Sequence, residues 1–148
     1  MREELRFSAP SPAAALLLAL SALSCTAGAR QEAAQVAEAM DRFRKADNAS
    51  KPATVGTLRA VKCSVTDVCK ARDACLASAE ATAKSLRLKS EVEQALVAID
   101  AGTLAKESAE AQGLALKLDE SATLLDEGFA ALPSCDDQVM ALKRKYAF

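Results

Sequence analysis

Histidine and tryptophan are absent from the 148 residues, and aromatic side chains make up only 3% of the chain, with one Tyr and four Phe. Without histidine, the chain can form no Ser-His-Asp triad, no histidine metal site and no C-x-x-C-H haem attachment site. The scarcity of aromatic residues also argues against a barrel or sandwich, whose strands favour aromatic and β-branched side chains. Because alanine is abundant instead, we expect a core of closely packed helices.

The only strongly apolar run lies near the start of the sequence. It covers the eleven residues Ala13–Leu23, which are dominated by Leu and Ala. That length fits the hydrophobic region of a signal peptide and falls short of the ~20 residues that span a bilayer. One cleavage site is offered by Ala27-Gly28-Ala29, an A-x-A sequence after which signal peptidase would release residues 30–148. The sequence therefore predicts an exported protein.

A second cleavage site lies before Cys25. The stretch Ser21-Ala22-Leu23-Ser24-Cys25 resembles the lipobox of bacterial lipoproteins, although Ala22 stands where that family favours Leu. The resemblance covers the leader only. It implies that residues 1–24 are a signal peptide, and that Cys25 becomes the first mature residue with diacylglycerol on its sulfur and a fatty acyl chain such as palmitate on its amine. Thr26, in place of an aspartate, implies transport to the outer membrane, at its periplasmic face or the cell surface. Cleavage after Ala29 would instead give a periplasmic or secreted protein.

The charges of the mature chain are nearly balanced. The whole chain has 19 basic and 20 acidic residues. Removal of residues 1–24 takes two of each, which leaves 17 basic and 18 acidic residues. Nucleic acid is not an expected partner, because binding to phosphates requires a clustered positive field. Residues 25–148 are enough for one compact domain.

Apolar residues recur at helical spacing through this domain, and turn signals separate the segments. Asp47–Pro52 forms a turn cluster, and Ser64 with Asp67 reads as a capping box. Gly102 suits the position after a helix, and Pro133 suits the end of one. The predicted helices cover residues 30–47, 54–62, 65–101, 103–132 and 135–146.

The clearest pattern lies between residues 104 and 132, where apolar and small residues alternate at spacings of four and three. A period close to 3.5 residues over four heptads predicts a left-handed contact with another helix. With a tight turn near residue 102, helices 65–101 and 103–132 would form a long antiparallel hairpin. We therefore predict an all-α fold, a three- to four-helix bundle built on that hairpin. The predicted contact residues are Leu104, Ser108, Ala111, Ala115, Leu118, Ala122, Leu125, Phe129 and Leu132.

Four cysteines remain after Cys25 is lipidated or removed, and in an exported protein they indicate two disulfides. Residues six apart in a regular helix lie ~9 Å apart along its axis, beyond disulfide reach, which excludes Cys69–Cys75. Cys63–Cys75 would span still more unless the chain doubles back. The hairpin brings Cys75 near the level of Cys135, so we expect Cys75–Cys135 together with Cys63–Cys69.

Motifs for chemistry are missing from the sequence. The cysteine intervals of six, six and sixty do not match zinc sites, and there is no C-x-x-C pair for redox chemistry. Phosphate-binding glycine loops and the G-x-S-x-G motif are also missing. The basic run Lys143-Arg144-Lys145 offsets a helix dipole, and could instead touch anionic lipid or a partner.

These observations predict a non-enzymatic, lipid-anchored envelope protein without cofactor or metal. It would act by helix-mediated contact with an unknown envelope protein, or by self-association through helix 104–132. The alternative is a soluble exported helical binder or inhibitor of a ligand or a target enzyme.

Overall fold

The computed structural model describes residues 12–148, with side chains from Ala27 onward. The described residues contain helices and no strand, so the prediction of an all-α fold is confirmed. Two long helices of 35 and 33 residues dominate the fold, accompanied by a second pair and a single helical turn. The elements are α1 (Pro12–Lys45), α2 (Lys51–Ala60), α3 (Thr66–Asp100), α4 (Ala109–Gln112) and α5 (Leu114–Tyr146).

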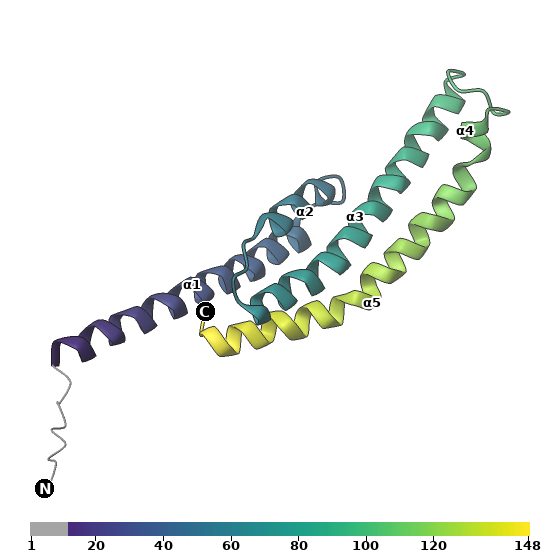
Figure 1. Cartoon of the computed structure of the whole chain (residues 1–148). Helices are drawn as coiled ribbons and strands as arrows, with labels where there is room; N and C mark the ends of the chain where they lie inside the picture. The colour runs from purple at the N-terminus through teal and green to yellow at the C-terminus, as the bar shows by residue number, and fades with distance from the viewer. Residues whose placement is uncertain (1–11) are drawn as a thin grey trace, which may run out of the picture.

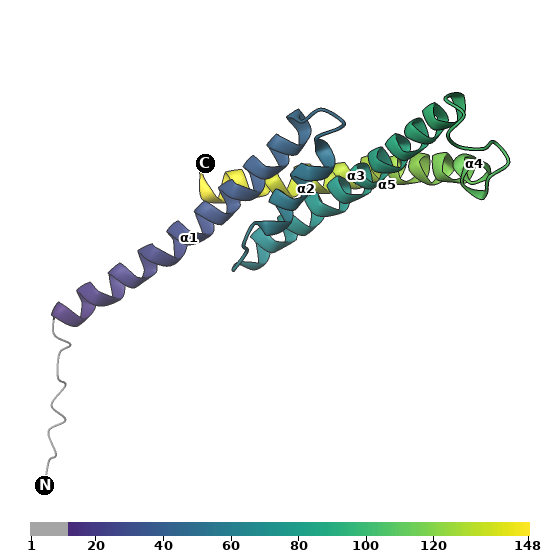
Figure 2. The same cartoon turned by 90° about the horizontal axis from the view of Figure 1, so that it is seen from above.

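The predicted hairpin is present and consists of α3 and α5. Both helices lie side by side as far as the loop that contains α4, as Figures 1 and 2 show. α1 contacts α3 and α5, whereas α2 contacts α1 and α3. Both views place α1 and α2 beside one half of the hairpin only, so its other half extends beyond them as two helices.

The contact between α3 and α5 follows a strict heptad. Ser78 on α3 faces Gly128 on α5, and one heptad further Ser85 faces Ser121. These small residues let the two backbones approach closely. Every seventh residue of α5 from Leu114 to Leu142 is buried: Leu114, Ser121, Gly128, Cys135 and Leu142.

The sequence prediction of the residues facing α3 was therefore wrong. Leu118 and Phe129, two of the predicted contact residues, retain 45% and 61% of their exposure. The prediction assumed that the largest apolar side chains would face the neighbouring helix. The two helices instead pack through glycine and serine, because only small residues allow so short a separation. The part of the predicted stripe from Ala115 to Phe129 lies on another face of α5, whereas Leu104 and Leu132 pack against the two core clusters.

Pro133 does not end a helix, contrary to prediction. The predicted segments 103–132 and 135–146 belong to the single helix α5, with Pro133 inside it. Proline lacks the N–H that would bond to the carbonyl of Phe129, and α5 bends in its middle instead of ending (Figure 1). Continuation beyond Pro133 buries Val139 and Leu142, which offsets the lost hydrogen bond.

The connection between the hairpin helices is longer than the predicted tight turn. Gly102 adopts φ 74°, the left-handed conformation expected of a glycine after a helix. The next long helix, however, begins at Leu114 and not at residue 103. Between them Ser108 caps α4, because its side chain accepts a hydrogen bond from the Ala111 amide at 3.2 Å. The predicted capping box also fails to form, since the Ser64 hydroxyl donates to Glu32 instead.

The main core lies where all four longer helices meet. α1 contributes Met40 and Phe43, α2 contributes Leu58, and a smaller cluster of Val92, Ala95 and Leu114 lies near the end of the hairpin. Both expected cysteine pairs lie at disulfide distance. The Cα atoms are 4.5 Å apart in Cys75–Cys135 and 5.2 Å apart in Cys63–Cys69.

Candidate functional site

Three segments meet at one end of the helix bundle. They are the first part of α1 whose side chains are described, the α2–α3 connection and the end of α5. We call residues 27–34, 61–67 and 140–148 the base. The Arg30 guanidinium donates a 2.8 Å hydrogen bond to the carbonyl of Ala147. The Ser64 amide donates to Glu32 at 2.7 Å. These bonds link α1 to both other segments of the base.

A second network at the base joins α3 to α5. The Lys145 ammonium lies 2.7 Å from a carboxylate oxygen of Asp67, and the Tyr146 hydroxyl donates to the same carboxylate at 3.2 Å. The hydrogen bond from Lys145 holds the pKa of Asp67 below its ordinary value, against the opposing effect of partial burial. The same bond raises the pKa of Lys145. Sequence reasoning missed this network, because Asp67 was interpreted as part of a helix cap.

Cys25, the predicted lipidation site, precedes the base by two residues. Its backbone belongs to α1, but its side chain lies outside the residues whose side chains the structure describes. The predicted leader, residues 1–24, lies partly outside the described range as well. The first buried side chain of the described part is Ala29, with 6% exposure. Cleavage before Cys25 therefore leaves the described core intact. Among the described helices, none is long and apolar enough to cross a membrane.

Charge is distributed unevenly along the molecule. The base carries five basic residues, Arg30, Lys62, Lys143, Arg144 and Lys145, against the two acidic residues Glu32 and Asp67. Residues 79–127, which include the part of the hairpin beyond α1 and α2 and which we call the distal hairpin, carry five basic and ten acidic residues. The two ends of the molecule therefore have opposite net charge.

An open groove of about 750 Å³ lies at the base between α1 and the end of α5. It combines two cations with two aromatic rings, and Phe148 remains 37% exposed. The groove is lined by Ala27, Arg30, Gln31, Ala34, Lys145, Tyr146 and Phe148.

Exposed apolar side chains lie on α5 beyond the reach of α1. They are on the same face of α5 that α1 covers nearer the base. On α5, α1 reaches Asp136 through an ion pair with Arg44, and buried Val139 packs into the α1-containing core. The same heptad position of α5 holds Leu132, Leu125 and Leu118, which lie one, two and three heptads before Val139 in the sequence. The antiparallel α3–α5 register, which pairs Val92 with Leu114, places Leu118 level with Leu88 of α3. We call Leu118, Leu125 and Phe129 of α5 the distal apolar face.

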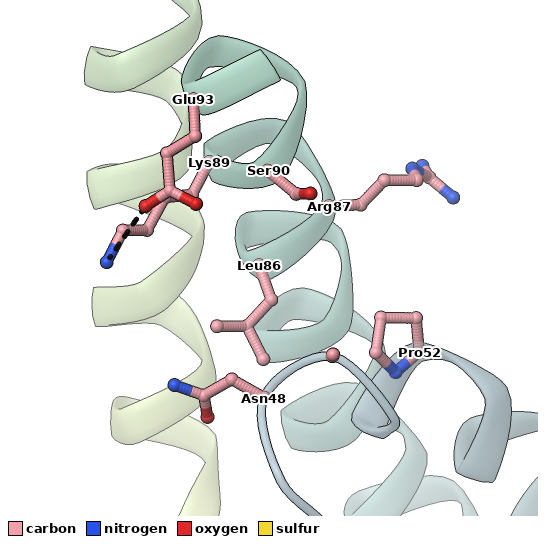
Figure 3. Close-up of a pocket in the computed structure, with 8 residues that line it drawn as sticks. Asn48, Pro52, Leu86, Arg87, Lys89, Ser90 and Glu93 are labelled. Carbon is pink, nitrogen blue, oxygen red and sulfur yellow. Dashed lines mark ion pairs between the residues drawn. The ribbon is translucent and has the colours of Figure 1, made fainter. Parts of the chain in front are cut away.

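A smaller groove of about 470 Å³ marks the level at which α1 ends and α2 begins. Figure 3 shows the turn between these helices, with Asn48 and Pro52, lying against Leu86 of α3. Further along α3, Lys89 and Glu93 extend together and form an ion pair at 3.8 Å. The groove thus mixes apolar with charged side chains.

All four cysteines whose side chains the structure describes are disulfide-bonded. The described residues contain no cluster of three or more His, Cys, Asp or Glu that could hold a metal ion. No family model, curated protein or solved structure matches the chain. The base and the distal apolar face are the candidate functional surfaces of the described residues.

Proposed function

We propose that the protein is a non-enzymatic, lipid-anchored protein of the bacterial cell envelope that acts through protein–protein contact. In this proposal Cys25 is the first mature residue and carries the lipid at the outer membrane. The observation that supports the proposal is the separation of two surfaces. The base lies next to Cys25, whereas the distal apolar face lies toward the opposite end of the hairpin.

The geometry sets how far the contact surface stands from the membrane. Only three residues separate Cys25 from Ala29, the first buried residue of the described part, so the anchor has no long tether. The 35 residues of α3 correspond to a helix about 50 Å long, at 1.5 Å per residue. The proposed anchor would hold the base at the lipid surface and present the distal hairpin to other proteins.

A second copy of this chain is the partner that we propose. The distal apolar face continues the surface on which α1 packs, so it already has the shape that a helix requires. Anchored copies lie on one membrane, all with the base at the lipid surface, which raises their effective concentration for side-by-side contact. In such a parallel pair, Leu118 of one copy lies at the level of Leu118 of the other, and Leu125 likewise. An isologous two-fold contact of this kind closes on itself.

The intact mass of the mature protein tests the anchor. We expect Cys25 as the first residue with the added mass of diacylglycerol and an acyl chain, and recovery of the protein with membranes. The Cys25→Ser variant should lose both. A first residue of Arg30 without lipid mass would contradict the anchor and support a soluble exported binder or inhibitor.

Native mass in mild detergent tests the contact. The wild type should be a dimer, and Phe129→Ser should weaken the dimer about tenfold or more, because burial of one large apolar side chain contributes ~1.5–3 kcal/mol. Leu116→Ser is the matched control, since Leu116 is 73% exposed on α5 but lies on another face of the helix. Single cysteines at Leu118 and Leu125 should each crosslink to their own counterpart. A monomeric wild type would contradict self-association and leave another envelope protein as the partner.

A further inference from the structure

We propose that the base is itself a binding site for the headgroups of an anionic phospholipid surface, separate from the lipid on Cys25. Lysine and arginine near a membrane are attracted to acidic lipids, and aromatic rings favour the interface between headgroups and acyl chains. The base is the part of the described chain in which both kinds of side chain meet beside the predicted anchor.

The base keeps a net positive charge because its five basic residues outnumber its two acidic residues. Glu32 accepts hydrogen bonds from the amide and hydroxyl of Ser64. Asp67 is neutralised by Lys145, as described above. Lys62, Lys143 and Arg144 are exposed, and none forms an ion pair within the described residues. The base therefore presents these exposed cations from two different segments of the chain.

The groove between α1 and the end of α5 supplies the apolar component. Phe148 and Tyr146 line it together with Arg30, so a lipid phosphate and the adjoining glycerol would meet a cation and aromatic rings in one place. The distal hairpin, with ten acidic against five basic residues, is repelled by the same surface. Attraction at one end and repulsion at the other would hold the hairpin upright. This orientation rests on the proposed anchor, whereas headgroup binding does not.

Vesicle flotation tests the proposal with the mature chain, residues 25–148, carrying Cys25→Ser so that no lipid is attached. The described core begins at Ala29, so this chain keeps every described core residue. We expect binding to vesicles that contain equal parts of phosphatidylglycerol and phosphatidylcholine, and little binding to phosphatidylcholine alone. High salt should release the protein, since exposed charges are screened beyond ~10 Å at 0.1 M salt.

Charge removal at matched positions locates the site. Lys62→Gln with Arg144→Gln removes two cations from the base, and should weaken binding about 25-fold, at about fivefold for each charge. Arg87→Gln with Lys106→Gln removes two cations from the distal hairpin, and should leave binding unchanged or strengthen it. Circular dichroism of both variants checks that the helices are retained.

Two outcomes would overturn the proposal. One is equal binding of the wild type to both kinds of vesicle, and the other is the same loss of binding in both double variants. Neither outcome depends on lipidation, because the assay uses a chain without lipid. Conversely, a mature protein that begins at Arg30 would contradict the anchor and leave headgroup binding at the base to be measured as before.

Discussion

Ser78 on α3 and Gly128 on α5 are in direct contact, and the Ser78 hydroxyl donates a 2.8 Å hydrogen bond to the carbonyl oxygen of Gly128. A Cβ atom added to Gly128 would lie 3.1 Å from the Ser78 carbonyl oxygen and 2.5 Å from the Thr82 hydroxyl oxygen. The separation of the two long helices is therefore set by the absence of a side chain at one residue.

Gly128→Val should force α3 and α5 apart. We expect a loss of about 1–3 kcal/mol in the free energy of unfolding, as is typical of overpacking at a close contact. Gly56→Ala is the matched control, because a Cβ at Gly56 meets nothing within 4 Å and Gly56 lies inside α2. That substitution should stabilise by about 0.5–1 kcal/mol through helix propensity. Urea unfolding measures both, and a neutral Gly128→Val would contradict the close contact.

The layer of Ser85 and Ser121 should show coupled energetics. The two hydroxyl oxygens are 3.1 Å apart, and Ser121 also donates to the Ser85 carbonyl. Ser121→Ala should cost about 1–3 kcal/mol, because it takes a partner from the buried Ser85 hydroxyl. Ser85→Ala with Ser121→Ala removes both hydroxyls, and should cost less than the sum of the single changes. Ser90→Ala, at an exposed position, should stay within ~0.5 kcal/mol. Additive costs would rule out coupling.

The two disulfides should differ in their effect on stability. Cys75 and Cys135 are 60 residues apart, whereas Cys63 and Cys69 are six apart. On the chain-entropy account, replacing the first pair with alanine lowers the free energy of unfolding by about 4 kcal/mol, and replacing the second by about 2 kcal/mol. Thermal unfolding of the two double variants measures the difference. An equal loss, or a greater loss for the short pair, would contradict this expectation.

The ion pair between Asp67 and Lys145 should make stability depend on pH in acid. Because the folded state lowers the pKa of Asp67 from its ordinary value of 3.8, the unfolded chain takes up a proton first as the pH falls. The contribution is therefore complete above pH 3.8 and is lost as the pH falls through the lowered pKa. Asp67→Asn should be less stable than the wild type at neutral pH, and the difference should shrink in acid.

The control for this titration is Asp119→Asn, at an exposed position of α5 that forms no ion pair within the described residues. Its stability should follow the wild type through the acid range. A difference between Asp67→Asn and the wild type that stays constant down to low pH would assign the effect to something other than the charge of Asp67.

Sequence reasoning was sufficient for the elements whose cause is local. The all-α class, the turn near Asp47 and the break at Gly102 each depend on periodicity or on a residue with a restricted backbone. The level of Cys75 against Cys135 depends only on helix rise and on where the hairpin turns. These features therefore needed no knowledge of tertiary packing.

The remaining features depend on which face of α5 meets α3. Apolar periodicity identified a stripe through Leu118 and Phe129 but could not show that Gly128 permits a closer approach on another face. Pro133 ended the predicted helix, because proline disfavours a helix interior, whereas burial of Leu142 and the bond at Cys135 favour its continuation. The contacts of Asp67 with Lys145 and Tyr146 join residues nearly 80 positions apart, and no local signal marks them.

The bond between Cys75 and Cys135 also determines how the molecule responds to mechanical load. A pull that separates α3 from α5 at the loop containing α4 would peel them apart one heptad at a time, through Val92, Ser85 and Ser78. The apolar contacts of Val92 break first and the hydrogen bonds of Ser85 and Ser78 follow, but the disulfide bond does not break. Peeling therefore stops at Cys75, inside the main core, and Val139 and Leu142 stay packed beyond it. The ends of α3 and α5 near α4 can therefore separate while the contacts of the hairpin with α1 are kept.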